Sequence, residues 1–206
     1  MTKQYIRSLL KNTLRQIDKT SLYHNTYLDY LLETAINQTY FEIHAQSPMA
    51  LGQYTKRYAS QTVTLDATSG RYQTALTVSL VPLPDKRGGV RTIVAANDLD
   101  LYFAPMTDQE LNMTPEGTEA YGITTTIPIV MGFVTRPTMI EYSGMTAGVA
   151  AGGVHLDLLV AFHSLLETDV VPLPYGQDMK IIADALKILG LVPPKDLLDN
   201  NASITQ

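Results

Sequence analysis

The sequence predicts an α+β protein in which helical segments at both ends flank a β-rich middle. Apolar residues recur at helical spacing in the N-terminal segment and again near the C-terminus, whereas the middle alternates apolar residues with Thr and Ser. We therefore expect a helical hairpin over 1–60, a mostly antiparallel, β-sandwich-like region over 61–170, and a C-terminal helix with a polar tail over 171–206. The helical segments are expected to form one bundle.

The N-terminal segment contains two amphipathic patterns. Residues 3–18 carry an apolar stripe opposite a basic face made of Lys3, Arg7, Lys11 and Arg15. A second helix is expected from Thr26, where Thr26 and Asp29 resemble a capping box, to Ser47, because Pro48 cannot continue the hydrogen-bond ladder. The short linker between the patterns predicts an antiparallel hairpin.

The middle of the chain has the two-residue period of half-buried strands. Residues 62–65 and 76–80 show it most clearly, and a turn-rich break at 67–70 separates them. We expect six to eight mostly antiparallel strands, because no helical crossovers divide them. The remaining strands are expected at 90–95, 100–103, 123–134, 138–142 and 154–162. The tetrapeptide Val-Pro-Leu-Pro, at 81–84 and 171–174, is interpreted as an extended exit from a strand.

The C-terminal pattern predicts a helix over 175–189. Met179, Ile182 and Leu186 lie on one face, and Gly190 suits the position after the last turn. Pro193 and Pro194 prevent continuation, and the tail beyond them is polar apart from Leu197, Leu198 and Ile204.

Composition excludes several classes of function. The net charge is −5 and no stripe of Lys and Arg occurs, which argues against sequence-specific nucleic-acid binding. The chain contains no cysteine, so disulfides, thiolate nucleophiles and Cys-based zinc sites are excluded. We expect neither a secretion signal nor a membrane span, because no sufficiently long apolar stretch is present.

No motif indicates a catalytic, metal or cofactor site. The Gly-rich segment 144–153 lacks the lysine of a phosphate-binding loop, and we interpret it as a side-chain-poor loop between two strands. Such a loop would also suit a crowded annular space. A metal cluster is conceivable on the acidic and imidazole side chains of 155–169. His155 and Asp157 would share one strand face, but the spacing does not fix the face of His163, eight residues further on, and we favour solvent-facing strand ends. These residues are His155, Asp157, His163, Glu167 and Asp169.

Two residue classes point to contacts with other proteins. Twelve tyrosines and no tryptophan favour an interface, since tyrosine buries area while keeping a polar tip. Arg87, Arg91 and Arg136 lie beside turn-forming Gly or Pro and are candidates for inter-subunit ion pairs, with solvated loops as the equal alternative.

The order of several short motifs resembles a known family. A helical hairpin leads to Tyr58, a strand at 63–66 and the stretch 71–76, and the sequence ends with 169–174, a helix and 193–200. Between these segments lie Leu80-Val-Pro-Leu-Pro84, Gly88-Gly-Val-Arg91 and Asp98-Leu-Asp-Leu-Tyr-Phe103-Ala-Pro. This arrangement resembles the connector (ring or neck) proteins of tailed bacteriophages, in particular of the crAss-like podovirus group. The resemblance covers most of the chain and is weakest at 143–153.

The resemblance implies a non-enzymatic virion protein that assembles in the host bacterial cytoplasm. It would form a ring, expected to be dodecameric, beneath the portal protein and would contact other neck and tail ring proteins. DNA would pass through the channel without sequence-specific contact, as a net negative, lysine-poor protein allows. The predicted contacts are the basic face (Arg7, Lys11, Arg15), the C-terminal helix and tail (Met179, Ile182, Leu186, Leu197, Leu198) and the Gly-rich loop.

Two other classes stay open at this stage. One is a β-sandwich module that binds a glycan or a peptide through exposed tyrosines, with the helices as oligomerisation elements. The other is an enzyme with a dispersed site, which the lack of a convergent polar cluster disfavours.

Overall fold

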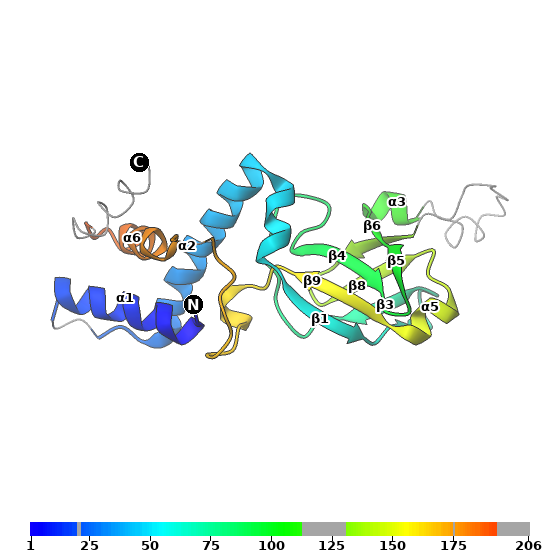
Figure 1. Cartoon of the computed structure of the whole chain (residues 1–206), viewed down its shortest axis with the longest axis horizontal. Coiled ribbons are helices and arrows are strands. Elements are labelled where there is room, and N and C mark those ends of the chain that lie inside the picture. The colour runs from blue at the N-terminus through cyan, green and yellow to red at the C-terminus, as the bar shows by residue number, and fades with distance from the viewer. Residues whose placement is uncertain (20–21, 113–130, 175, 193–206) are drawn as a thin grey trace. The chain divides into compact units, whose positions relative to one another are not determined.

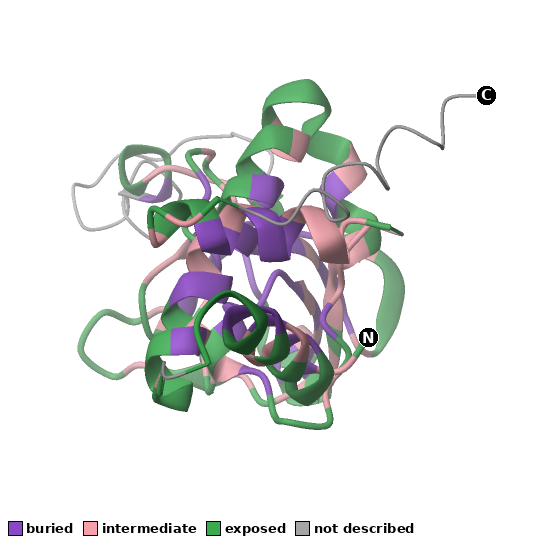
Figure 2. Ribbon diagram, turned by 90° about the vertical axis from the view of Figure 1, so that its left-hand side faces the viewer, coloured by how far each residue is buried: buried purple, intermediate pink, exposed green. Residues whose placement is uncertain are grey.

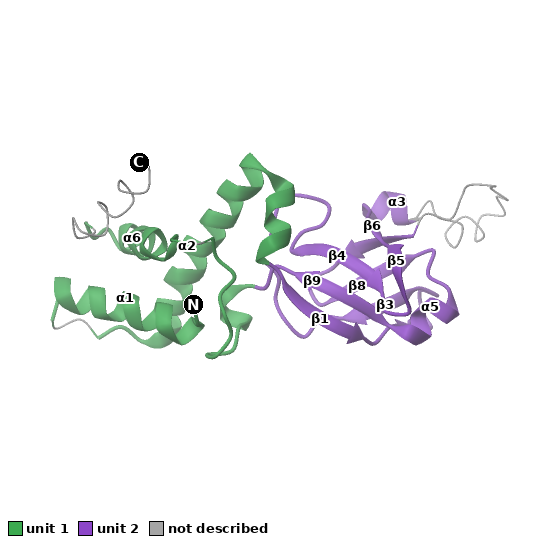
Figure 3. Cartoon of the chain, viewed as in Figure 1, with its two compact units in different colours: residues 1–54, 161–206 green, residues 55–160 purple. Residues whose placement is uncertain are grey.

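The computed structural model describes residues 1–19, 22–112, 131–174 and 176–192. The chain divides into two compact units, one formed by 1–54 with 161–206 and the other by 55–160 (Figure 3). The fold is α+β, as predicted, with the N-terminal helices and the C-terminal helix in the first unit and the sheets in the second. The β unit thus begins at 55 and ends at 160, whereas the sequence suggested 61 and 170.

Within the described residues, the helical unit contains three α-helices: α1 (Lys3–Ile17), α2 (Asn25–Gln46) and α6 (Asp178–Ile188) (Figure 1). Two 3₁₀ helices, η1 (Pro48–Tyr54) and η3 (Phe162–Ser164), follow α2 and precede α6 in the chain. The Thr2 side chain caps α1 by accepting from the amide of Tyr5. The cap of α2 differs from the prediction. Its N-cap is His24, whose ring nitrogen accepts from the amide of Thr26, while Asp29 binds basic side chains of α1.

The core of the helical unit lies where α1, α2 and α6 meet. Figure 2 shows buried residues on the inner faces of the helices and exposed residues on their outer faces. Fully buried leucine and isoleucine side chains of this size each contribute about 1.5–3 kcal/mol relative to exposure. The buried side chains of these three helices include Ile6, Leu10, Leu28, Leu31, Leu32, Ile36, Tyr40, Ile181, Ile182 and Leu186.

Helix α6 ends as its sequence predicts. Gly190 adopts φ +72°, and its amide donates to the Lys187 carbonyl. The amide of Leu191 donates to the Leu186 carbonyl at 3.0 Å, which completes a Schellman motif. A residue with a Cβ disfavours this left-handed backbone, and glycine therefore stabilises the end of the helix.

The described strands of the β unit form two sheets. The first has the order β1-β9-β4-β5, with all pairs antiparallel. The second has the order β2-β3-β8-β7-β6, with antiparallel pairs except the parallel pair β6–β7. The predominance of antiparallel pairs confirms the prediction. The strands are β1 (Lys56–Gln61), β2 (Thr64–Leu65), β3 (Tyr72–Ala75), β4 (Val90–Ala95), β5 (Asp98–Tyr102), β6 (Ala104–Pro105), β7 (Gly132–Thr135), β8 (Met139–Ser143) and β9 (Val154–Leu158).

The two sheets share contacts within this unit. Phe103, directly after β5, lies edge-on to Tyr142 of β8, with ring centroids 5.4 Å apart. The Tyr142 hydroxyl donates to the Thr74 hydroxyl of β3 at 3.0 Å. Gly89 allows a close approach beside β4, since a Cβ there would lie 2.6 Å from the Leu80 Cβ and 2.9 Å from the Leu159 carbonyl oxygen. The described part of this unit also contains the short helices α3 (Asp108–Asn112) and α5 (Ala147–Gly152).

Some predicted strands differ from the observed ones. Residues 76–80 alternate in exposure but form no ladder, and only Leu80 makes an isolated bridge, to Val160. Strand β2 is exposed on both residues, so its apolar alternation marks no buried face. Most of the strand expected at 123–134 lies outside the described residues. Strand β1 was not predicted, because Lys56–Gln61 shows no apolar alternation.

Both Val-Pro-Leu-Pro copies adopt the same local structure. The amide of Leu83 donates to the Val81 carbonyl, and that of Leu173 donates to the Val171 carbonyl, at 3.0 and 2.9 Å. These two-residue hydrogen bonds define γ-turns centred on proline, whose restricted φ suits the inverse form. Each valine is buried and donates its amide to a distant carbonyl, Leu159 for Val81 and Met1 for Val171. The predicted extended exits are therefore turns that anchor the chain.

Candidate functional site

The most highly connected polar cluster lies in the helical unit and involves α1, α2 and the segment 162–169. Arg7 donates to both carboxylate oxygens of Asp29 at 2.6 Å and to Glu167 at 2.8 Å. The hydrogen bond to Asp29 is the main cause of a raised pKa for Arg7, so this guanidinium stays charged. This bidentate pair brings the first turns of α2 beside the N-terminal half of α1.

Lys3 extends this cluster into the core. Its side chain is 5% exposed, and its ammonium donates to the carbonyls of His163 and Leu165 at 3.1 and 3.0 Å. The same nitrogen lies 3.6 Å from Asp29 and 5.2 Å from the centre of the Phe162 ring. Backbone bonds join the same segments, because the amides of Lys3 and Gln4 donate to the carbonyls of Asp169 and Glu167. The cluster therefore holds the 162–169 segment on the start of α1.

These contacts correct part of the predicted basic face. Lys3 is buried and Arg7 pairs within its own unit, so neither belongs to an open basic surface. Lys11 is half-buried and lines a surface hollow of about 450 Å³ together with Gln4, Arg7, Ser8, Asn25 and Glu167. Arg15 is exposed. Among the described residues, neither Lys11 nor Arg15 forms an ion pair.

Two of the three arginines expected at subunit contacts are engaged within the β unit. Arg91 has a 3% exposed side chain and binds Asp85 at 3.1 Å and the Gly88 carbonyl, so it stabilises its own turn. Arg136 links α3 to β8 by binding Asp108 at 2.5 Å and Glu141 at 3.0 Å. Arg87 is half-buried and forms no ion pair with a described residue.

The C-terminal helix has less free surface than predicted. Ile182 and Leu186 are fully buried in the core of the helical unit, and they are therefore not available to a neighbour. The amphipathic stripe predicted for α6 is present in the structure. Its apolar face packs against α2 and α1 within the helical unit. Met179 is half-buried. Leu197 and Leu198 lie outside the described residues.

Four of the five side chains considered as metal ligands make separate structural contacts. His155 accepts from the amide of Ser60, which has φ +48° in an irregular part of β1. His163 lies 2.7 Å from Glu33, Glu167 binds Arg7, and Asp169 accepts from the amide of Leu166. Within the ranges that the structure describes, no three His, Asp or Glu side chains gather in a way that could hold a metal ion.

The Gly-rich segment contains the short helix α5, where the sequence predicted a loop. Thr146 caps this helix, and Gly153 follows it with φ +76°. A Cβ on Gly152 would lie 2.7 Å from the Asn97 side chain, and one on Gly153 would lie 2.7 Å from the Gln61 carbonyl oxygen. These glycines are therefore explained by close packing within the unit, where no crowding by a neighbouring subunit is needed.

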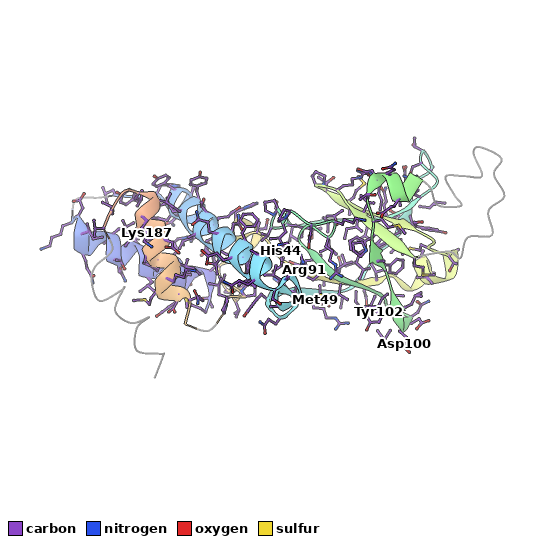
Figure 4. The ribbon with its side chains drawn as sticks, turned by 90° about the horizontal axis from the view of Figure 1, so that it is seen from above. His44, Met49, Arg91, Asp100, Tyr102 and Lys187 are labelled. Carbon is purple, nitrogen blue, oxygen red and sulfur yellow. The ribbon has the colours of Figure 1, made fainter. Side chains whose placement is uncertain are left out.

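Large apolar side chains remain exposed on both units. On the helical unit, Tyr30 is 64% and Leu166 68% exposed, and on the β unit Tyr102 is 61% exposed. Others that are at least half exposed are Tyr5, Leu22, Met49, Leu65, Leu99, Val170 and Val192. Figure 4 shows Met49 in the helical unit and Tyr102 in the β unit among the side chains. Exposed tyrosines of this kind are typical of protein contact surfaces.

The described sheet surfaces offer little room for a glycan. A hollow beside Tyr72 and Tyr142, also lined by Gly70, Arg71 and Met145, measures about 40 Å³. Such a space holds a few water molecules at most. The glycan-binding alternative therefore gains no support from this pocket.

No protein-family model matches the chain, and no curated protein matches it significantly in sequence. Of the helices in the described ranges, none combines the length and the apolar character needed to cross a bilayer.

Sequence reasoning missed the central role of Lys3. The helical pattern placed it on the basic face, and its burial depends on carbonyls more than 150 positions away in the chain. Neither its spacing nor its neighbours in sequence carry that information. The one available signal is its position in the first turn, where a lysine is unfavourable beside the positive end of the helix and needs a compensating partner.

Proposed function

We propose that this protein is a structural subunit of a connector ring between portal and tail in a tailed bacteriophage of the crAss-like podovirus type. The proposal rests on two observations: the contacts that charged side chains make within the chain, and the exposure of large apolar side chains to solvent. Arg7, Arg91 and His163 are engaged in contacts within the chain, whereas large tyrosine and aliphatic side chains face solvent on both units. Such a surface supports adhesion between subunits and neither makes nor breaks a covalent bond.

The order of sequence motifs supports the connector assignment. Ring formation requires a heterologous contact, in which two different surfaces of one chain meet and the rotation closes. The ring is dodecameric to match the portal protein, and it also contacts other neck and tail rings. The net charge of −5 suits a channel through which DNA moves without being held. The protein belongs to the virion neck and assembles in the host bacterial cytoplasm.

Basic residues that form no ion pair with a described residue are the best remaining candidates for contacts with another chain. Lys11 and Arg15 form no ion pair with the described residues and thus suit an acidic neighbour. Arg87 has the same property in the β unit. The polar tail that contains Leu197 and Leu198 is assigned to the portal or an adjacent subunit.

Imaging a complex with the portal protein tests the assignment. The full chain is co-expressed with the portal protein encoded in the same genome, and purified particles are averaged. The expected result is a closed ring of this chain stacked on the portal. A chain that stays unassociated, or that virions carry only in tail fibres, contradicts the proposal.

Deletion of residues 191–206 tests the tail. The truncated chain is expected to fold but not to support the completion of particles. The double substitution Leu197→Ser with Leu198→Ser is expected to reduce particle assembly by a smaller amount. Normal particle assembly by the truncated chain would remove the tail from the contact.

A further inference from the structure

The first sheet ends in two edge strands of opposite charge. Among the described strands, β1 pairs only with β9 and β5 pairs only with β4. Strand β1 begins with Lys56 and Arg57, and strand β5 contains Asp98 and Asp100. Arg57 and Asp100 are both exposed, and neither forms an ion pair with a described residue.

The register relates the two charged edges across the sheet. Arg57 is opposite Asp157 of β9, and Asp157 is two residues from His155, which is opposite Val94 of β4. Val94 is opposite Tyr102, and Asp100 is two residues from Tyr102 on β5. Paired residues share a face and alternate residues return to it, so Arg57 lies on the same face as Val94 and Tyr102. Asp100 lies in the irregular part of β5 between the pairs Val94–Tyr102 and Ala95–Asp98, where it is exposed at the opposite edge of the sheet. Figure 4 shows Asp100 and Tyr102 at the same margin of the β unit.

We propose that β5 of one copy pairs with β1 of a second copy of this chain, with Arg57 and Asp100 as cross-strand neighbours. The strand directions allow it. The three pairs in the sheet are antiparallel, so β1 and β5 run in opposite directions. A second copy that continues the sheet therefore presents its β1 antiparallel to β5, the pairing in which the backbone bonds are most direct. The lengths also match, at six and five residues.

Charge selects this pairing over the two symmetric alternatives. Pairing β5 with β5 brings four carboxylates together, and pairing β1 with β1 brings four cations together. Like charges directly opposite one another on adjacent strands are destabilising, whereas opposite charges are stabilising. Exposed charges also protect sheet edges from indiscriminate pairing. The combination favours a head-to-tail contact, which generates a ring when its rotation closes. This inference rests on the proposed ring function and supplies its subunit contact.

Charge-reversal variants of the full chain test the pairing. Arg57→Glu and Asp100→Arg, each alone, put like charges at the contact and are expected to weaken self-association about 10-fold, as measured by sedimentation equilibrium. Lys19→Glu, at an exposed position just after α1, is the control and should leave self-association unchanged. An equimolar mixture of the two variants restores opposite charges at both contacts, because each edge then meets a complementary one. The mixture is expected to associate as the wild type does.

Cross-linking detects the contact even when it is weak. The chain has no cysteine, so Ala59→Cys on β1 and Tyr102→Cys on β5 supply the only thiols in two separate proteins. A short bismaleimide should join these two proteins to each other in preference to joining either to itself. The edge pairing is overturned if either protein cross-links to itself as much as to the other one. It is also overturned if the mixture of charge variants does not regain wild-type self-association.

The outcomes separate this inference from the ring proposal. A ring on the portal that assembles normally from either charge variant leaves the connector assignment standing and removes the β1–β5 contact. Recovery in the mixture, together with a chain that is absent from the neck, supports the contact and removes the connector assignment.

Discussion

Replacing Lys3 by methionine tests whether the buried ammonium holds the helical unit together. Methionine fills the space of the lysine stem, so the substitution removes the charge and its hydrogen bonds with little change in volume. The carbonyls of His163 and Leu165 lose their donor, and Asp29 loses a cation at 3.6 Å. Hydrogen bonds from a charged donor contribute about 1.5–3 kcal/mol each, and relief of the lysine's own desolvation offsets part of that loss.

The expected result is a free energy of unfolding lower by about 3 kcal/mol for the helical unit. Urea titration followed by far-ultraviolet circular dichroism measures it, with two transitions fitted because the chain has two units. Lys11→Met is the matched control, since Lys11 lies on the same helix without an ion pair to a described residue. It should change the free energy by less than about 0.5 kcal/mol. A Lys3→Met variant as stable as the control would refute the structural role of the cluster.

Three further predictions concern the two units. Gly89→Ala should destabilise the β unit by about 1–3 kcal/mol, because the new Cβ would clash with Leu80 and the Leu159 carbonyl. Gly52→Ala is the control, since a Cβ at position 52 would have open space around it, and it should be near neutral in the same urea titration. Gly190→Ala should cost about 1 kcal/mol at the end of α6, where φ is +72°, and a midpoint of thermal unfolding equal to wild type would contradict this. Hydrogen bonds from Lys86, then from the Thr107 amide and hydroxyl, lower the pKa of Glu110 from 4.5 to about 2. Because this pKa is depressed in the folded state, the advantage of wild type over Glu110→Gln should be complete above pH 4.5 and vanish as the pH falls to about 2, as thermal melts across that range would show.

Helices were the most predictable part of this fold. The start of α1 and the end of α6 follow from local chemistry, because Thr2 caps the first and Gly190 ends the second. Strands were predicted less well, because pairing depends on distant partners. Residues 76–80 have a strand's alternation but no neighbour that pairs along them, while Lys56–Gln61 lacks the alternation and is an edge strand beside β9.

The candidate contacts show the same limit. An amphipathic stripe predicts that one face of a helix is buried. It does not predict whether that face packs against the same chain or against another one. Ile182 and Leu186 are buried within the helical unit of the same chain. A charge likewise does not reveal its partner: Arg7 and Arg91 pair nearby in space, whereas Lys11, Arg15 and Arg87 have no partner among the described residues. The complementary edges Arg57 and Asp100 became visible only through the register of four strands.

The most direct measurement is the average of particles containing this chain and its portal protein, at a resolution that traces strands. The account predicts a closed ring in which each subunit's four-stranded sheet continues into the next. Subunits that remain separate, or that meet through other surfaces, would contradict it.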